Sequence, residues 1–507
     1  MNVLIVLGHP RPDSLCGGLA RAYEDGAHEA GVDVRTLELA RLEFEQDVLT
    51  ECPTEQHLEE DLVEARADIR WADHLVFVYP NWWGTMPALL KGFFDRVFTP
   101  GFAFSSYEDG EGAGHEELLR GRTAELLVTM DMPAWVYRWI YREPGTNAIK
   151  RSTLGYAGVR TTRVTPFGPV EESTLDEREG WLGEARELGR SLADGPESRL
   201  ARRKRQLLTS LKALRLQFYP MAWVAYTVGV LAAVGSSDVL TAPVYWLGFG
   251  FVFFLEAATV LSNEYVDYET DRENTFAGPF TGGSRVLVDG ELSFRALRTG
   301  AVVALALAGI FGLGVLALGA GSPVVMASVM AALAVLAIGY TVPPLQLSYR
   351  TLGELDVATT HSLGVMLCGY VFVGGSLTDP VPWLLSAPLL LGTLPSIILA
   401  GVPDYEADVA AGKRTIAVRF GVDRAATLAG AAALLAAVIA SSWQLLGVVP
   451  DAYGPVIYLS AVHALGIVWL LHTRLDPEEA PTRIDGLMVA ALSYVLWFGV
   501  VPLVGLL

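Results

Sequence analysis

Residues 196–235 read PESRLARRKRQLLTSLKALRLQFYPMAWVAYTVGVLAAVG, and the chain changes character within this stretch. Four consecutive basic residues, from Arg202 to Arg205, precede an apolar segment that begins near Phe218. A basic run is often only a solvated helix face, but beside an apolar segment it is also typical of the cytoplasmic flank of a membrane span. The stretch therefore separates a charged N-terminal part from an apolar C-terminal part.

The composition of the chain supports this division. The chain has 507 residues, of which 52% are hydrophobic and 18% are charged. It is too long for one ordinary domain and too apolar for an ordinary soluble protein. We predict a soluble domain over residues 1–195, a basic linker over 196–216 and a membrane domain over 217–507.

The C-terminal part contains nine apolar segments, most of which approach the roughly 20 residues that a helix needs to cross a bilayer. The segments lie near residues 218–235, 243–262, 297–318, 323–341, 357–375, 383–402, 424–447, 454–472 and 485–506. Every second connecting loop lacks Lys and Arg: 236–242, 319–323, 376–380 and 448–454. The positive-inside rule then predicts a multi-pass protein of the cell membrane with a cytoplasmic N-terminal domain and, after nine spans, an external C-terminus.

Apolar strands alternate with amphipathic helices over residues 1–195. The strand candidates are Val3–Leu7, Val34–Glu38, His74–Tyr79, Ala124–Thr129 and Gly158–Pro166. The helical stretches are Gly17–Ala30, Leu58–Ala67, Ala88–Val97 and a last one from about Asp176 to Leu192. This alternation predicts an α/β fold with a doubly wound parallel sheet, in which ligands bind at the carboxyl ends of the strands.

Charge and cysteine content exclude several classes of protein. The net charge is −19, and most of it falls in the first 200 residues. An acidic surface repels a polyanion, so we expect no nucleic-acid partner. The three cysteines, Cys16, Cys52 and Cys368, form no CxxC motif, so we expect neither a disulfide framework nor a zinc site.

Two loops of the N-terminal part carry residues suited to a flat, phosphorylated ligand. The first strand is followed by GHPRPDSLC at residues 8–16, where Ser14 can cap the next helix and offer its hydroxyl to a phosphate. The third strand ends in YPNWWGTMP at residues 79–87. Trp82 and Trp83 can stack on a flat heteroaromatic ring, although packing against the following helix is an alternative.

These loops, together with PALLKGFFDRVF at residues 87–98, resemble the flavodoxin-like NAD(P)H:quinone oxidoreductases. The resemblance covers nearly all of residues 1–195 and implies a flavin that takes a hydride from NAD(P)H and passes it to a quinone. The residues that it implies for flavin binding are His9, Ser14, Leu15, Cys16, Pro80, Asn81, Trp82 and Trp83. Residues 129–133 read TMDMP where the best-known members have Thr-Thr-Gly-Gly, so FMN and FAD both stay open.

Two acidic clusters of the apolar part stand at predicted cytoplasmic helix ends: NEYVDYETD at residues 263–271 and DYEAD at 404–408. Each contains two Asp residues four positions apart, which lie on one face of a helix: Asp267 with Asp271, and Asp404 with Asp408. Facing clusters of this kind suit Mg²⁺, which prefers a few carboxylates plus phosphate oxygens. Nearby cations that could hold a diphosphate are Arg285, Lys413 and Arg414. Solvated helix ends, or the ion sites of a transporter, are the alternatives.

These clusters are similar to the two acidic motifs of the UbiA-type membrane prenyltransferases. Asn263, Asp267 and Asp271 match the first motif, with Glu264 at its first Asp position, and residues 404–415 match the second. The segments YTVPP at 340–344 and LGEL at 352–355 match the central cytoplasmic loop of the family. The resemblance spans residues 210–507. It implies that Asn263 and the four Asp residues are catalytic, that the four Asp residues bind Mg²⁺, and that the basic residues bind the diphosphate.

The implied reaction is the transfer of an isoprenyl group from a polyprenyl diphosphate to an aromatic, quinone-precursor acceptor within membrane lipid. A glycerol ether lipid or a carotenoid is an alternative acceptor, and a transporter with a flavoprotein domain is an alternative function. An allylic cation reacts with an electron-rich ring. A hydroquinone ring is electron-rich, whereas a quinone ring is electron-poor. The reductase domain is therefore predicted to keep the acceptor, or the prenylated product, reduced.

Overall fold

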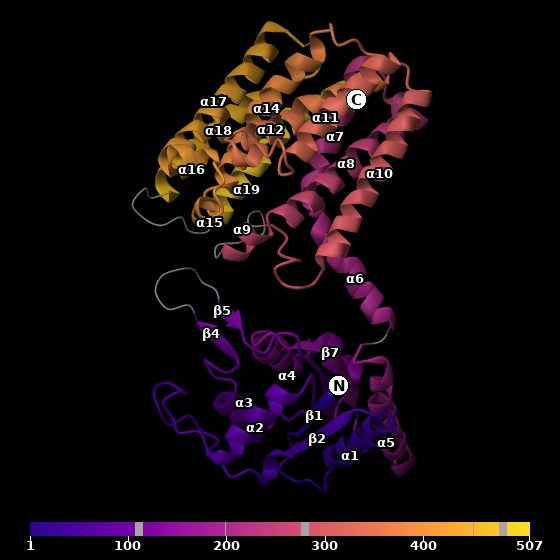
Figure 1. Ribbon diagram of the computed structural model, residues 1–507, viewed down its shortest axis with the longest axis vertical. Coiled ribbons are helices and arrows are strands. Elements are labelled where there is room, and N and C mark those ends of the chain that lie inside the picture. The colour runs from indigo at the N-terminus through magenta and orange to yellow at the C-terminus, as the bar shows by residue number, and fades with distance from the viewer. Residues whose placement is uncertain (107–114, 198, 275–282, 450, 476–483) are drawn as a thin grey trace. The chain divides into compact units, whose positions relative to one another are not determined.

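The computed structural model of the chain describes residues 1–106, 115–197, 199–274, 283–449, 451–475 and 484–507. The chain forms two compact units, Met1–Arg205 and Gln206–Leu507 (Figure 1). The predicted linker is helical over most of its length, as α6 (Arg199–Leu214), so the boundary between the units falls inside a helix.

The N-terminal unit is built on a parallel five-stranded sheet. Its strands are β1 (Asn2–Leu7), β2 (Asp33–Glu38), β3 (His74–Pro80), β6 (Thr123–Thr129) and β7 (Arg160–Phe167), in the order β2-β1-β3-β6-β7. All five predicted strands are confirmed, with bounds that differ by two residues at most. Because β2 and β3 pair with opposite sides of β1, the strand order reverses there, and a crevice for a ligand is expected at the carboxyl ends of β1 and β3.

Helices cover both faces of this sheet, because each central strand alternates apolar side chains between two cores. Val3, Ile5 and Leu7 of β1 enter the core that is shared with α1 (Leu15–Glu29) and α5 (Leu175–Arg190). Leu4 and Val6 enter the opposite core, under α2 (Glu60–Trp71) and α3 (Ala88–Val97). A short antiparallel pair, β4 (Phe104–Ser106) with β5 (His115–Glu117), lies outside the main sheet.

Helices α1 and α5 approach each other closely because each has a glycine at the contact. A Cβ atom on Gly26 of α1 would lie 1.9 Å from the backbone oxygen of Arg186, and one on Gly189 of α5 would lie 2.2 Å from that of Tyr23. Both partner atoms belong to helix backbone, which cannot move aside as a side-chain end could. The two glycines thus set the distance between the helices.

Gly189→Ala is expected to lower the free energy of unfolding of the N-terminal unit by about 1–3 kcal/mol, because the added methyl group overpacks this contact. Gly183→Ala, on the same helix, is the matched control: its Cβ would meet no described atom within 4 Å. It should raise that free energy by up to about 1 kcal/mol through helix propensity. Urea unfolding of the N-terminal unit measures both values, and a shift of the same sign for both substitutions would contradict the close packing of α1 and α5.

All regular secondary structure in the described residues of the second unit is helical. Its long helices are α7 (Tyr219–Val234), α8 (Pro243–Val266), α10 (Phe294–Leu318), α11 (Pro323–Gly339), α14 (Val381–Ala400), α17 (Val422–Leu446) and α18 (Leu459–Arg474). Two further spans are composite: α12 (Gly353–Thr359) continues through the π-helical segment η8 (Thr360–Gly364) into α13 (Val365–Phe372), and α19 (Asp485–Tyr494) continues into α20 (Leu496–Leu506).

These helices account for the nine predicted apolar segments. Eight helical segments in the described part of the chain are long and apolar enough to cross a membrane. The ninth, α11, is apolar but has only 17 residues, which is about 25 Å of helix. The prediction of nine spans is thus close, with α11 the span that is short.

Two short helices contain parts of the acidic motifs: α9 (Tyr268–Glu273) and α15 (Tyr405–Ala410). A third, α16 (Ile416–Phe420), follows the second motif. Helix α9 follows α8 directly, and α15 follows α14. Figure 1 shows α9 and α15 beside each other at one end of the helical unit, and their residues are in contact. The fold thus brings together two motifs that lie more than 130 residues apart in the sequence.

Candidate active sites

The two predicted ligand-binding loops of the N-terminal unit meet at the carboxyl ends of β1 and β3. The rings of His9 and Trp82 lie edge to face, with their centroids 5.5 Å apart. His9 Nδ1 accepts a hydrogen bond from the backbone N–H of Arg11 at 2.9 Å. Burial, with the nearby charge of Arg11, lowers the pKa of His9, so the ring is neutral at neutral pH. The contact joins the loops at the switch point of the sheet.

The N-terminus of α1 holds the other three predicted residues of the first loop. Ser14 caps the helix, and its Oγ accepts a hydrogen bond from the N–H of Gly17 at 3.3 Å. Leu15 is half-buried. Cys16 is buried with its Sγ 3.3 Å from Thr129 Oγ1, and burial raises the pKa of its thiol to about 11. The Cys16 side chain is therefore a core group, and only its backbone can reach a phosphate at the helix N-terminus.

The second loop projects its tryptophans away from the core. Pro80 is buried at the end of β3, and Asn81 donates its N–H to the Thr129 oxygen at 2.7 Å. Trp83 has a φ of 53° in a tight turn and is fully exposed (103%), whereas Trp82 is half-exposed. Trp83 therefore does not pack against the following helix, which was the alternative to a stacking role.

Two buried polar atoms beside this loop have no protein partner among the described residues: Asn81 Oδ1 and the hydroxyl oxygen of Tyr79. Buried polar atoms are nearly always hydrogen-bonded. The orphaned Asn81 Oδ1, in the same loop as the exposed Trp83, is therefore available to a ligand that supplies the missing bond. The chemistry of the two loops, a helix N-terminus and an aromatic surface, fits a flavin phosphate and its ring system.

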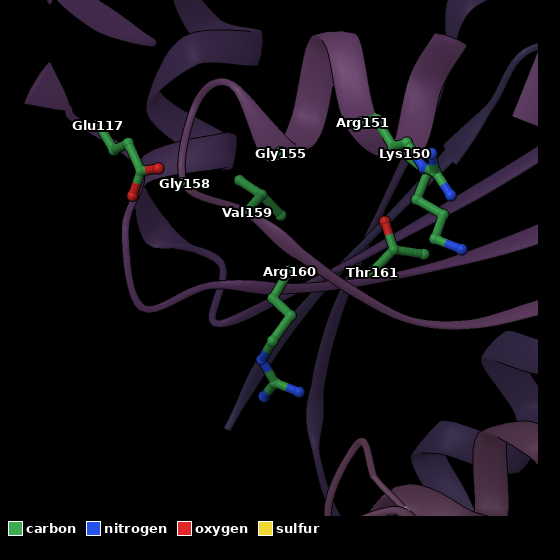
Figure 2. Close-up of a pocket in the computed structure, with 8 residues that line it drawn as sticks. All are labelled: Glu117, Lys150, Arg151, Gly155, Gly158, Val159, Arg160 and Thr161. Carbon is green, nitrogen blue, oxygen red and sulfur yellow. The ribbon is translucent and has the colours of Figure 1, made fainter. Parts of the chain in front are cut away.

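Two cavities of the N-terminal unit have linings that contain none of the predicted flavin-binding residues. One, of about 240 Å³, is lined by residues that follow β6, among them Tyr137, whose hydroxyl accepts a hydrogen bond from the N–H of Thr146 at 3.0 Å. The other, of about 400 Å³, has the basic residues Lys150, Arg151 and Arg160 in its lining (Figure 2). Since Arg160 begins β7, this second cavity lies at the opposite edge of the sheet from the two loops.

In the helical unit, Lys413 joins the two acidic motifs. Its Nζ lies 2.7 Å from Oδ2 of Asp267, the residue directly after α8, and 3.8 Å from Oδ1 of Asp408 on α15. A second link is the hydrogen bond from Asn274 Nδ2 to Asp404 Oδ1 at 2.7 Å. The structure therefore places Asp267, Asp408 and Lys413 in one buried ionic cluster.

The cluster has more negative than positive charge. Burial, with Asp267 and Glu264 nearby, raises the pKa of Asp271 to about 7. Burial also raises the pKa of Asp408 to about 7, although Lys413 opposes the shift. Burial alone would lower the pKa of Lys413, but Asp267 and Asp408 raise it, so this ammonium group stays charged. The raised pKa values of Asp271 and Asp408 indicate buried carboxylates that are costly to ionise, and a bound cation would stabilise their charged form.

The predicted basic residues differ in their positions. The Arg285 guanidinium donates to the backbone oxygens of Asp271 and Asn274, at 2.9 and 3.1 Å, and thereby fixes the end of α9. Arg414 is exposed. Of the three residues predicted to bind a diphosphate, Lys413 is the one whose charged group lies within the acidic cluster. Arg285 instead donates hydrogen bonds to the backbone at the end of α9.

Glu264 and Asn263 also take separate roles in the structure. The Glu264 carboxylate accepts hydrogen bonds from the Ser284 N–H at 3.0 Å and the Ser284 hydroxyl at 2.6 Å, so it holds the segment that follows α9. Asn263 Oδ1 is buried and has no hydrogen-bond partner in the described ranges. It lies one helical turn before Asp267, on the same face of α8, and is thus available to a ligand of the cluster.

Tyr349 is a contact residue that the sequence motifs did not single out. Its hydroxyl donates to Asp267 Oδ1 at 3.2 Å, and Lys413 Nζ lies 5.4 Å from the centre of its ring. Asn274 is another, through its bond to Asp404. The only signal for Tyr349 was its place in the central loop, whereas Asn274 merely follows the first motif by three residues.

The cluster can offer one or two carboxylates to Mg²⁺ but does not form a complete coordination shell by itself. Within the described residues, no three His, Cys, Asp or Glu side chains converge closely enough to hold an ion. Mg²⁺ usually takes only one or two carboxylates and completes its shell with water and substrate phosphate oxygens. Buried carboxylates on two adjoining helix ends, with an orphaned amide oxygen beside them, meet that requirement.

The fold and the two sites define the class of protein: a flavodoxin-like redox domain followed by a multi-pass membrane enzyme with paired acidic motifs. The profile of the UbiA prenyltransferase family matches residues 221–499, and the chain belongs to this family. The profile of the flavodoxin-like fold matches residues 1–188. The chain is thus a fusion of an NAD(P)H quinone oxidoreductase domain with a prenyltransferase domain.

Relatives of the N-terminal domain include an uncharacterized NAD(P)H oxidoreductase, YcaK, of Escherichia coli, 32% identical over 32% of this chain and 82% of the relative. The ribosyldihydronicotinamide dehydrogenase-like protein traD of Penicillium crustosum is 34% identical, over 26% of this chain and 57% of that protein's length. For the membrane domain, the solved structure of a UbiA homolog from Archaeoglobus fulgidus bound to GPP and Mg²⁺ is 19% identical, covers 57% of this chain and 99% of that chain, and has a TM-score of 0.40.

Proposed function

We propose that the membrane domain transfers an isoprenyl group from a polyprenyl diphosphate to an electron-rich aromatic acceptor, and that the N-terminal domain reduces a quinone with NAD(P)H. The observation that carries the first part is the buried cluster in which Lys413 contacts Asp267 and Asp408. A surplus of buried carboxylates beside a lysine suits a magnesium diphosphate, because the metal compensates the carboxylates and the ammonium group binds phosphate oxygen.

In this mechanism Asp267, Asp271, Asp404 and Asp408 would hold Mg²⁺, and Mg²⁺ would stabilise the negative charge of the departing diphosphate. Lys413 donates to the diphosphate as the C–O bond of the substrate breaks and its electron pair moves to oxygen. Asn263 offers its orphaned amide oxygen to the same assembly. The ring carbon of the acceptor then forms the new C–C bond, and the ring loses one proton.

For the N-terminal domain, the residues that would hold FMN or FAD are those of the two loops. The N-terminus of α1, with Ser14, Leu15 and Cys16, would bind the phosphate, while Pro80, Asn81, Trp82 and Trp83 would line the ring system. His9 connects the loops through Trp82. The flavin when bound accepts a hydride from NAD(P)H and passes it to the quinone.

We place the N-terminal domain and both acidic motifs on the cytoplasmic side of the cell membrane and the C-terminus outside. The support is the charge of the loops, since Lys and Arg are absent from every second one. Residue-specific labelling of the intact cell tests this orientation. A cysteine introduced at Leu507 should react with a reagent added outside the cell. Reaction of a cysteine introduced at the exposed Leu49 with the same reagent would reverse the proposed orientation.

The purified full-length chain, given Mg²⁺, an isoprenyl diphosphate and a hydroquinone, should release diphosphate and form a prenylated ring. Offering a glycerol ether lipid precursor or a carotenoid in parallel tests the alternative acceptors. A transporter would release no diphosphate. Product from the glycerol or carotenoid acceptor alone would leave the prenyltransferase in place and reject the aromatic acceptor.

The purified chain should also be yellow, contain about one flavin per chain, and bleach when NAD(P)H is added under anaerobic conditions. Trp83→Ala should weaken flavin binding about tenfold or more, because it removes the stacking surface. Leu49→Ala is the control, since this side chain is also exposed (73%) but lies outside both loops. Visible absorbance during flavin titration measures the affinity. A colourless chain that takes up neither FMN nor FAD would refute this role.

A further inference from the structure

A second polar group lies within the membrane spans, apart from the acidic cluster. Oε1 of Glu256, in the middle of α8, lies 3.5 Å from Nε2 of His361 in η8. The Glu256 side chain is only 10% exposed, while that of His361 is 31% exposed. Ionisable side chains inside a span are costly to bury and are usually functional, and neither residue belongs to the acidic motifs.

Two further unsatisfied groups interact electrostatically with members of this pair. One carboxylate oxygen of Asp356 is buried without a hydrogen-bond partner in the described part of the chain, and the charge of Asp356 acts on His361. The hydroxyl of Tyr219 is likewise buried without a described partner, and it lies within electrostatic reach of Glu256. Two orphaned polar atoms within electrostatic reach of the Glu256–His361 contact point to a polar ligand that completes the set.

The local backbone holds His361 in a fixed orientation. Its Nδ1 lies 3.1 Å from the backbone oxygen of Val357, so Nε2 faces Glu256. The residue stands in η8 (Thr360–Gly364), a π-helical segment inside an otherwise α-helical span. Such segments are uncommon and occur frequently at functional sites.

The pair lies on the face of α8 that also carries the first acidic motif. Asn263 and Asp267 follow Glu256 by 7 and 11 residues, which is close to two and three whole turns. Glu256 is therefore about 16 Å from Asp267 along the helix axis. A magnesium diphosphate, the first carbon of the prenyl group and one aromatic ring span a comparable length.

We propose that Glu256 and His361 bind a ring hydroxyl of the acceptor and select a neutral hydroxylated ring, such as a hydroquinone, over a ring that bears a carboxylate. This inference rests on the proposed prenyl transfer and names its acceptor class. Glu256 and Asp356 accept hydrogen bonds from a hydroxyl group, whereas they repel a carboxylate at short range. Asn263, between the pair and Asp267, has its orphaned oxygen on the same face.

The test uses the full-length chain in lipid nanodiscs with Mg²⁺, a fixed isoprenyl diphosphate, and either hydroquinone or 4-hydroxybenzoate under reducing conditions. The wild-type chain should show a KM for hydroquinone that is at least about tenfold lower than that for 4-hydroxybenzoate. Glu256→Gln and His361→Gln should each raise the KM for hydroquinone about tenfold or more, the effect of losing a hydrogen bond to a charged group. The KM for the isoprenyl diphosphate should stay within about twofold.

Two matched variants complete the design. Glu256→Asp keeps the carboxylate and should restore part of the hydroquinone affinity, which a merely structural role would not predict. Asp238→Asn removes an exposed carboxylate in the loop after α7 and should change neither KM. Binding of radiolabelled hydroquinone to each protein, without the diphosphate substrate, gives a readout that is independent of turnover.

Unchanged hydroquinone KM and binding in both Gln variants would overturn the inference while the proposed transfer stands. If either Gln variant fails to fold, the wild-type acceptor preference decides, and a lower KM for 4-hydroxybenzoate overturns the inference. If the wild-type chain transfers a prenyl group to neither ring, the proposed aromatic acceptor and this inference fall together.

Discussion

Asp267→Asn is expected to lower the rate of prenyl transfer by about two to four orders of magnitude. Asp267 contacts both Lys413 and Tyr349, from two different loops, so it stands at the centre of the acidic cluster. A neutral amide has the same shape but cannot compensate a divalent cation. Asp404→Asn should have an effect of the same order, because Asp404 belongs to the second motif. Diphosphate release and product formation, measured at saturating acceptor, give the two rates.

Asp423→Asn is the control for both substitutions, since it removes an exposed carboxylate at the start of α17 in the same unit. It should retain the wild-type rate. Removal of Mg²⁺ with EDTA should abolish the reaction in the wild-type chain, and added Mg²⁺ should restore it. Wild-type turnover by Asp267→Asn, or a rate that EDTA does not change, would reject the assignment of the metal to this cluster.

Supplied with a quinone, an isoprenyl diphosphate and Mg²⁺, the full-length chain should form prenylated product only when NAD(P)H is present. A quinone ring is too electron-poor to attack an allylic cation, and two-electron reduction converts it into a suitable acceptor. Fusion keeps the reductase near the transferase and raises its effective concentration. The yield of prenylated product should therefore be near-complete with NAD(P)H and at background without it.

Two controls separate this coupling from simple co-localisation. Dithionite should replace NAD(P)H when the quinone is offered, and the hydroquinone should need neither reductant. Trp83→Ala should lower the NAD(P)H-dependent yield at limiting flavin but leave the dithionite-dependent yield unchanged, because it alters only the N-terminal domain. Prenylated product from the quinone without any reductant would reject the coupling and leave the two separate activities intact.

Much of the fold follows from patterns that are local in the sequence. The strand at His74–Tyr79 and the helix at Ala88–Val97 agree with the structure to within one residue, because unbroken apolar runs and amphipathic spacing depend only on near neighbours. The apolar spans follow from length and composition alone. Segment α11 shows the limit of this reasoning, since its predicted 323–341 ends as a helix at Gly339, before the Tyr340–Pro344 loop.

By itself, the sequence determined the two domains, the parallel sheet, the helical spans and the spacing that puts each Asp pair on one helix face. Only the tertiary structure decided that Lys413 bridges the two motifs, that Arg285 braces backbone rather than entering the cluster, and that Cys16 is a core residue. It alone brought Glu256 to His361, across 105 positions of the chain (361 minus 256). Periodicity specifies which side chains share a face of one element, whereas contacts between distant elements depend on how the whole set of helices packs.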